Sequence, residues 1–179
     1  LHLLSRRQRQ MCIRDRGKAS PEMRVIVIPS WSGEKYENIA DRTGNWKVNI
    51  KIPKAGGPYH LEIIDGEKVR LENVMIGEVW LCSGQSNMQM PVEGWGKVKN
   101  YQQEVAQANY PNIRLMTVSN TISLSPSQEF TAVGGGWQVC SSGTIREFSA
   151  AAYFFGREIA RTQQVPVGLI CAHWGGTNI

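Results

Sequence analysis

The stretch from residue 77 to residue 91 reads GEVWLCSGQSNMQMP and joins a nearly continuous apolar run to a short polar segment. Apolar runs of this length are typical of strands that are covered on both faces, as in a parallel sheet. We expect the strand to end at Gly84, directly before Ser86, which is flanked by the amides Gln85 and Asn87. The residues alone leave two interpretations of this serine open: it caps a helix, or it is a nucleophile held at a strand end.

The longer, carboxyl-terminal part of the chain alternates between strand-like and helix-like patterns. Two further apolar runs, at 112–118 and 165–172, resemble the first. Apolar residues over 148–159 recur at helical spacing, and a Thr-x-x-Glu capping box that starts at Thr144 would begin this helix. A weaker helix is expected over 98–108. Alternating strands and helices are typical of an α/β fold whose parallel sheet has crossover helices.

The amino-terminal part shows a shorter alternation. Apolar and polar residues alternate over 46–52, which is the period of a half-buried strand. Glycine and proline mark a turn at 53–58, and Asp65-Gly66 indicates a hairpin. These patterns predict a small antiparallel β module. We therefore divide the chain into a leader at 1–22, the β module at 23–74 and the α/β part at 75–179.

The 179-residue chain carries a net charge of +5, and much of this charge lies in the first sixteen residues, which contain five arginines and one aspartate. The remainder is close to neutral, so the basic stripe expected of a nucleic-acid-binding face is missing. No stretch approaches the ~20 apolar residues of a membrane span. Segment 11–16 resembles translated adapter sequence, and we interpret residues 1–22 as a disordered or non-native leader that shows no signal peptide.

The four cysteines, at positions 12, 82, 140 and 171, include no Cys-x-x-Cys pair that would indicate a zinc or redox motif. Cys82 and Cys171 lie in apolar runs, where a free cysteine usually packs as a small hydrophobe. Serine acyl transfer requires no cofactor. The sequence therefore predicts neither a metal site nor a cofactor.

Two loops follow predicted strands of the α/β part, where ligands of open α/β sheets gather. Ser86 lies in one loop, and Gly175 and Gly176 lie in the other. If the two strands are neighbours, a serine hydroxyl faces unobstructed backbone N–H groups, which is the arrangement that acyl transfer needs. The glycines could equally make a simple turn. His173 is a possible base, whereas His60 occupies a polar position on an alternating strand.

Two long blocks, GEVWLCSGQSNMQMP and the segment from Arg146 that ends in ICAHWGGTNI, resemble the sialate O-acetylesterase family. The resemblance covers roughly residues 45 to 179. It implies the flavodoxin-like parallel sheet of the SGNH hydrolases and an acetylated carbohydrate as substrate. It further implies that Ser86 is the nucleophile, and that its N–H and Gly175 or Gly176 form the oxyanion hole. Gln85 and Asn87 would lie at the same site. Family members are commonly secreted, periplasmic or lysosomal.

The sequence departs from the family pattern after Gly175-Gly176, because neither the family's Gln-Gly-Glu block nor its late Asp-x-x-His segment follows. We therefore interpret the chain as an amino-terminal fragment with an incomplete sheet, and expect little or no esterase activity. His173 stands where the family usually has a small residue, so it does not inherit the role of base. The oligomeric state is not predicted.

A non-catalytic carbohydrate-binding module is the competing interpretation. Trp80, Trp95 and Trp174 fall near the expected crevice, and exposed tryptophan can stack on sugar rings. A lipase or peptidase is disfavoured, because the Gly-x-Ser-x-Gly motif is missing.

Overall fold

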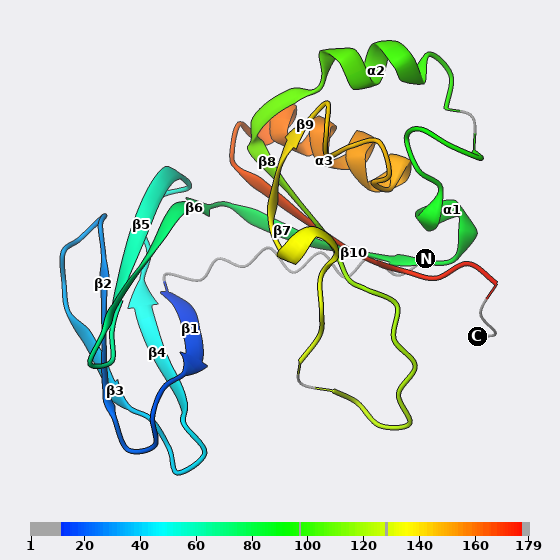
Figure 1. Cartoon of the computed structure of the whole chain (residues 1–179). Helices are drawn as coiled ribbons and strands as arrows, with labels where there is room; N and C mark the ends of the chain where they lie inside the picture. Colours follow the sequence, from blue (N-terminus) through cyan, green and yellow to red (C-terminus); the bar gives the residue numbers. More distant parts are fainter. Residues whose placement is uncertain (1–11, 97, 128, 177–179) are drawn as a thin grey trace. The chain divides into compact units, whose positions relative to one another are not determined.

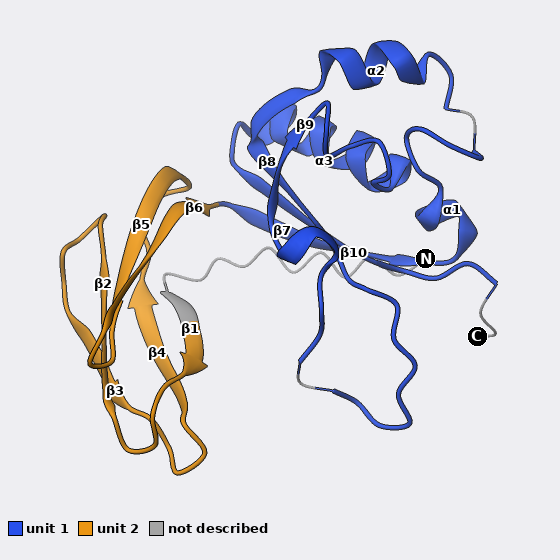
Figure 2. Cartoon of the chain, in the orientation of Figure 1, with its two compact units in different colours: residues 1–5, 77–179 blue, residues 6–76 orange. Residues whose placement is uncertain are grey.

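The computed structural model describes residues 12–96, 98–127 and 129–176 of the chain (Figure 1). The described residues divide into two compact units, which meet in the sequence between Ile76 and Gly77 (Figure 2).

The amino-terminal unit consists of antiparallel strands. One sheet pairs β1 with β4, and a second sheet has the strand order β3-β2-β5-β6. Side chains alternate between buried and exposed along β4, as its sequence predicts, and Asp65-Gly66 lies in the hairpin between β5 and β6. Trp46, Val48 and Ile50 of β4 pack with Val25, Val27 and Leu61 in the core of this unit. The strands are β1 (Cys12–Lys18), β2 (Arg24–Pro29), β3 (Tyr36–Ile39), β4 (Asn45–Lys51), β5 (Gly56–Ile64) and β6 (Lys68–Ile76).

The interpretation of residues 1–22 as a disordered leader is wrong for Cys12–Lys18. This segment forms β1, whose backbone pairs along the whole length of β4. Gly17 lies under the indole of Trp46, so closely that a Cβ at this position would come within 2.7 Å of the ring. Backbone pairing with a free strand edge depends little on side-chain pattern, which explains why no local pattern indicated this strand. Residues 1–11 lie outside the described part of the chain.

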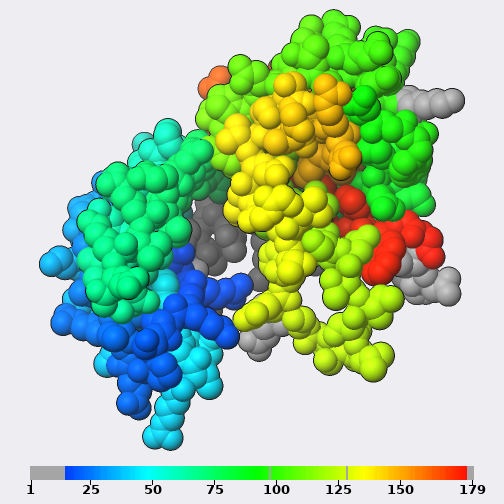
Figure 3. Space-filling view, viewed as in Figure 1, coloured from blue at the N-terminus to red at the C-terminus, as the bar shows by residue number. Residues whose placement is uncertain are grey.

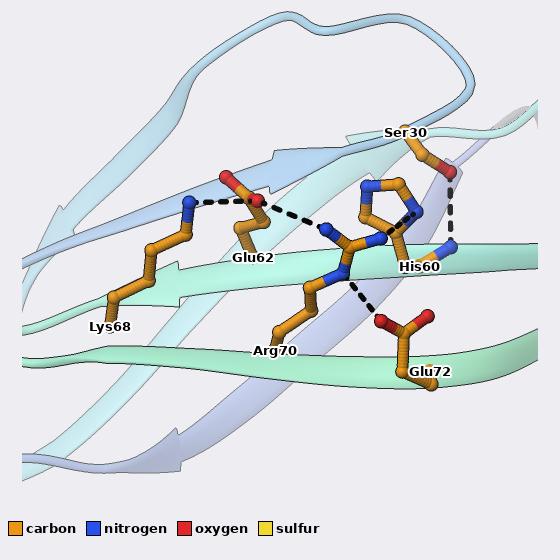
Figure 4. A network of polar contacts seen from close by, with 6 residues as sticks. All are labelled: Ser30, His60, Glu62, Lys68, Arg70 and Glu72. Atoms are coloured by element: carbon orange, nitrogen blue, oxygen red, sulfur yellow. Dashed lines mark hydrogen bonds and ion pairs between the residues drawn. The ribbon is translucent and has the colours of Figure 1, made fainter.

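A polar network covers the outer face of β5 and β6 (Figure 4). Glu62 accepts from Lys68 at 2.8 Å, and Arg70 contacts Glu72 at 2.5 Å and the Nδ1 atom of His60 at 3.3 Å. The hydrogen bond from Lys68 lowers the pKa of Glu62. Such exposed pairs contribute little to stability. His60 therefore belongs to a surface network of the amino-terminal unit.

The carboxyl-terminal unit contains a mixed sheet with the strand order β7-β10-β8-β9. The strands β7 (Glu78–Gly84), β8 (Asn109–Thr117) and β10 (Val167–His173) are parallel, which confirms the expected α/β class and the three predicted strands. In the flavodoxin-like order the first strand lies between the second and the third. Here the third, β10, lies in the middle, but the first and third strands are neighbours in both orders.

The fourth strand, β9 (Gln138–Ser141), runs antiparallel to β8 and was not expected from the sequence. It follows a short 3₁₀ turn, η1 (Val133–Gly135), in a glycine-rich segment. Only four residues long, β9 shows too short an alternation to be recognised from its sequence. The loop between β8 and η1 projects from the unit (Figures 1 and 3).

Three helices accompany this sheet. They are α1 (Ser86–Gln89), α2 (Tyr101–Gln107) and α3 (Ala150–Gln163). The capping box expected at Thr144 is wrong, because the Ser149 hydroxyl caps α3 by accepting from the Ala152 N–H at 3.2 Å. Thr144 instead closes a turn, accepting from the Ser141 N–H at 2.9 Å. Residues 146–148 form turns and a bend whose carbonyl groups bond to the segment after α1, and so the helix begins later than its apolar pattern suggests.

The core of this unit lies between the sheet and its helices. Tyr153 of α3 is fully buried among strand residues that include Leu115, Leu169 and Cys171. Trp80 packs edge-on against Phe155 at 5.0 Å between ring centres. Trp80 therefore contributes to core packing and is not available for stacking on a sugar.

Candidate functional site

The two loops that carry the predicted site residues start at adjacent strand ends. β7 and β10 are hydrogen-bonded parallel neighbours, and Gly84 at the end of β7 lies opposite His173 at the end of β10. The two strands are therefore neighbours, as a shared site requires. Both loops leave the same edge of the sheet, at the carboxyl ends of its strands (Figure 1).

Ser86 is the first residue of α1, directly after β7. The N-cap position belongs to Gln85, whose carbonyl oxygen accepts from the N–H groups of Met88 and Gln89. The interpretation of Ser86 as a helix N-cap is therefore wrong. Its side chain is exposed at the strand end, as a nucleophile must be.

The helix that carries Ser86 is fixed at both of its ends. Its first residue continues from β7, while the segment after its last residue pairs with the chain that leads into α3. The Met90 carbonyl accepts from the Ala150 N–H at 2.8 Å, and the Val92 N–H donates to the Phe148 carbonyl at 3.1 Å. An ion pair between Glu93 and Arg146 adds a further contact between these two segments. A turn of only four residues is thereby held by contacts far apart in the sequence.

The glycine loop after β10 lies against this helix. The Trp174 N–H donates to the Gly84 carbonyl at 3.1 Å, and the Gly175 N–H donates to Oε1 of Gln89 at 2.7 Å. A Cβ added to Gly175 would lie 2.6 Å from that oxygen and only 3.6 Å from Oγ of Ser86. A Cβ at position 175 would therefore displace the Gln89 amide, whereas its distance from Ser86 is an ordinary van der Waals contact.

The remaining predicted site residues are placed less specifically. Gly176 adopts a φ of +75°, in the left-handed region that favours glycine, and a Cβ there would meet open space. Asn87 is exposed on α1, and Gln85 is half-buried. The predictions did not include Gln89. Its position three residues after Ser86, on the same face of a helical turn, was the available signal.

An open depression of about 320 Å³ lies at the carboxyl ends of the parallel strands. This volume is at the lower end of the range of small-molecule sites. Trp174, 39% exposed, forms one part of the wall. The complete lining is Ser83, Gly84, Val118, Ser119, Asn120, Thr121, Ala172, His173 and Trp174.

His173 is not paired with Ser86. Both of its ring nitrogens are buried and have no hydrogen-bond partner among the described residues. Burial lowers the pKa of His173 and so favours the neutral form of its ring.

The carboxyl-terminal unit contains three cysteines. Cys82, Cys140 and Cys171 are free and buried, as expected for the two that lie in apolar runs. Within the described ranges, no three His, Cys, Asp or Glu side chains are grouped so as to hold a metal ion. None of the helices that the structure describes is long and apolar enough to cross a membrane.

Fold and site together define an α/β protein with a candidate hydrolase site at the carboxyl ends of two adjacent parallel strands. A family model described as carbohydrate esterase, sialic acid-specific acetylesterase, matches residues 76–179. The chain belongs to this family of carbohydrate acetylesterases, which confirms the resemblance seen in its sequence.

Individual relatives agree with this assignment. The chain is 34% identical to the sialate O-acetylesterases of Pongo abelii and Homo sapiens over 157 residues, which cover 82% of this chain and 29% of either relative. The crystal structure of a carbohydrate acetylesterase from Xanthomonas citri matches with a TM-score of 0.85 and 33% identity, over 94% of this chain and 38% of that one. The chain thus spans less than a third of the length of the curated relatives that it matches.

Proposed function

We propose that this chain carries the nucleophile of a carbohydrate O-acetylesterase, and that the nucleophile is Ser86. The observation that carries the proposal is the contact between the two strand-end loops, in which Gly175 lies against Ser86. Membership of a carbohydrate acetylesterase family supports acyl transfer as the reaction class.

In the proposed reaction, Oγ of Ser86 attacks the acetyl carbonyl carbon and its proton passes to a base. The bond from that carbon to the sugar oxygen then breaks, and the sugar leaves as an alcohol after taking up a proton. Water hydrolyses the acetyl-serine and releases acetate. Backbone N–H groups stabilise the oxyanion of each tetrahedral intermediate, and removing one such donor typically slows an enzyme ~10²- to 10³-fold.

The depression beside this loop is the proposed site of the sugar. Ser83, Ser119, Asn120 and Thr121 offer hydroxyl and amide groups for sugar hydroxyls, and Trp174 offers an aromatic surface. The same features support the second candidate, a carbohydrate-binding module without catalysis. Trp95, also exposed, adds to this second possibility.

We further propose that the described residues do not supply the base. His60 lies in the surface network of the amino-terminal unit, and the ring nitrogens of His173 are buried without a partner. A serine without a base retains the donors that bind an oxyanion but lacks the group that accepts its proton. We therefore expect little turnover of p-nitrophenyl acetate by the chain of 179 residues.

Prolonged labelling with a fluorophosphonate probe in alkaline buffer tests the proposal, because buffer base then accepts the Ser86 proton in place of the missing catalytic base. The Ser86 oxygen should form a bond to phosphorus as fluoride leaves, and mass spectrometry should find the adduct on Ser86 in the wild type and nowhere in Ser86→Ala. An unlabelled wild type would favour the binding module. Rapid turnover of p-nitrophenyl acetate that Ser86→Ala abolishes would contradict the missing base and make His173 the candidate for that role.

A further inference from the structure

The side chain of Gln89 joins the two loops of the candidate site. Its Oε1 accepts from the Gly175 N–H at 2.7 Å, across 86 positions of sequence. The amide is half-buried, so this hydrogen bond is partly shielded from competition by water. Because only the oxygen of the amide can accept from an N–H, the orientation of the Gln89 amide follows from its partner.

The backbone that carries Gln89 is rigidly held. Its own N–H donates to the Gln85 carbonyl at 2.9 Å within α1, and the next residue, Met90, accepts from the Ala150 N–H at 2.8 Å. Gln89 thus reaches the glycine loop from a fixed support. A side chain on a rigidly held backbone fixes the position of the group to which it is hydrogen-bonded. A side chain on a mobile loop would instead move with that group.

The hydrogen bond also decides which backbone donors of the glycine loop are engaged. The Trp174 N–H donates to the Gly84 carbonyl, and the Gly175 N–H donates to Gln89. Of the three consecutive N–H groups in 174–176, the third belongs to Gly176, where the positive φ turns the chain. Gly175 therefore lies close to Ser86, but its N–H is already engaged by the Gln89 side chain.

We propose that Gln89 is a positioning residue, which holds the glycine loop against Ser86 through the Gly175 N–H and leaves the Gly176 N–H as the loop's donor to the oxyanion. The inference rests on the proposed function of Ser86. This positioning role requires an acceptor oxygen at position 89 but does not require the amide nitrogen.

Two substitutions at position 89 separate the acceptor from the shape of the side chain. Gln89→Glu keeps an oxygen at the same reach, whereas Gln89→Met keeps the length but offers only a weak thioether acceptor. Gln103→Met, on the exposed side of α2, is the matched control. The rate of fluorophosphonate labelling at Ser86 is measured for each variant, because the phosphonyl oxygen occupies the place of the oxyanion.

We expect Gln89→Met to slow labelling by ~10-fold or more, since small displacements of catalytic groups have effects of this size. Gln89→Glu and Gln103→Met should label at rates close to that of the wild type. Equal rates in Gln89→Met and the wild type would overturn the proposal, provided that thermal unfolding shows both to be folded.

Amide hydrogen exchange at Gly175 tests the role of Gln89 independently of the proposal that Ser86 is the nucleophile. Loss of a typical hydrogen bond should speed exchange of the Gly175 N–H about fivefold in Gln89→Met, with near-normal protection in Gln89→Glu. If the wild type is not labelled at all, the nucleophile proposal fails, and this exchange pattern alone decides the role of Gln89. Unchanged exchange in Gln89→Met would show that Gln89 does not hold the loop.

Discussion

Glycine at position 175 allows the two strand-end loops to meet. A methyl group there would collide with Oε1 of Gln89 and come into van der Waals contact with Ser86, the residue on which the proposed chemistry depends. The sequence indicated both loops, because each follows an apolar run, but it did not indicate the hydrogen bond between them. That bond depends on which strands are neighbours, and no local pattern reports it.

Asp41 shows how a single carboxylate can organise a turn in the amino-terminal unit. Its Oδ1 accepts from the Thr43 hydroxyl at 2.7 Å and from the N–H groups of Thr43 and Asn45 at 2.8 and 2.9 Å. These hydrogen bonds, led by the Thr43 hydroxyl, lower the pKa of Asp41 to about 2. The turn connects β3 to β4 and so fixes the start of the strand that supplies Trp46 to the core.

We predict that Asp41→Ala lowers the unfolding temperature at pH 7, and that its effect fades in acid. Since the pKa in the folded state lies below the ordinary value of 3.8, the carboxylate stabilises the fold above that value. This contribution is lost as the pH falls through about 2. Thermal unfolding of both proteins from pH 7 to pH 2 would check this, and a difference that stays constant over the range would contradict it.

At the scale of secondary structure, long apolar patterns were reliable and short or displaced elements were not. The runs that became β7, β8 and β10 were predicted because each is long and almost continuously apolar. The start of α3 was misplaced, because pairing of the preceding segment with residues after α1 overrides the local capping box. The short strand β9 and the strand β1 were missed, since tertiary pairing rather than periodicity defines them.

Gly156 is a point at which α3 packs closely on the sheet. A Cβ there would lie 2.5 Å from Cδ1 of Leu169, a fully buried residue of β10. Alanine favours a helix over glycine by ~1 kcal/mol, yet overpacking of a core costs ~1–3 kcal/mol. We therefore predict that Gly156→Ala destabilises the carboxyl-terminal unit despite its higher helix propensity.

Chemical denaturation of Gly156→Ala, of Leu169→Val and of the double variant would measure this effect. Valine at position 169 lacks one methylene of the leucine. The double variant should therefore lose less free energy of unfolding than the sum of the losses in the two single variants. Simple additivity of the two losses would argue that the helix moves away from the sheet without strain.

In the whole molecule, the two units have separate cores, and the family match begins at residue 76, one residue before the carboxyl-terminal unit continues from Gly77. α1 and α3 pack on the face of the sheet that contains Cys82, Leu115 and Leu169. Side chains alternate along a strand, so Val79 and Leu81 of β7 point to the opposite face, where they are 62% and 67% exposed. Trp137, which follows η1, lies on that face beside Gly168 and Val79.

Exposed apolar side chains that are grouped on one face promote self-association, whereas isolated ones do not. We predict that Leu81→Lys lowers the binding of a hydrophobic dye by the 179-residue chain by roughly half and reduces its self-association. Leu124→Lys is the control, because Leu124 is fully exposed in the projecting loop after β8 and packs on no sheet. Dye fluorescence and sedimentation velocity of both variants would measure the difference. Equal effects of the two substitutions would mean that added charge, and not this face of the sheet, governs association.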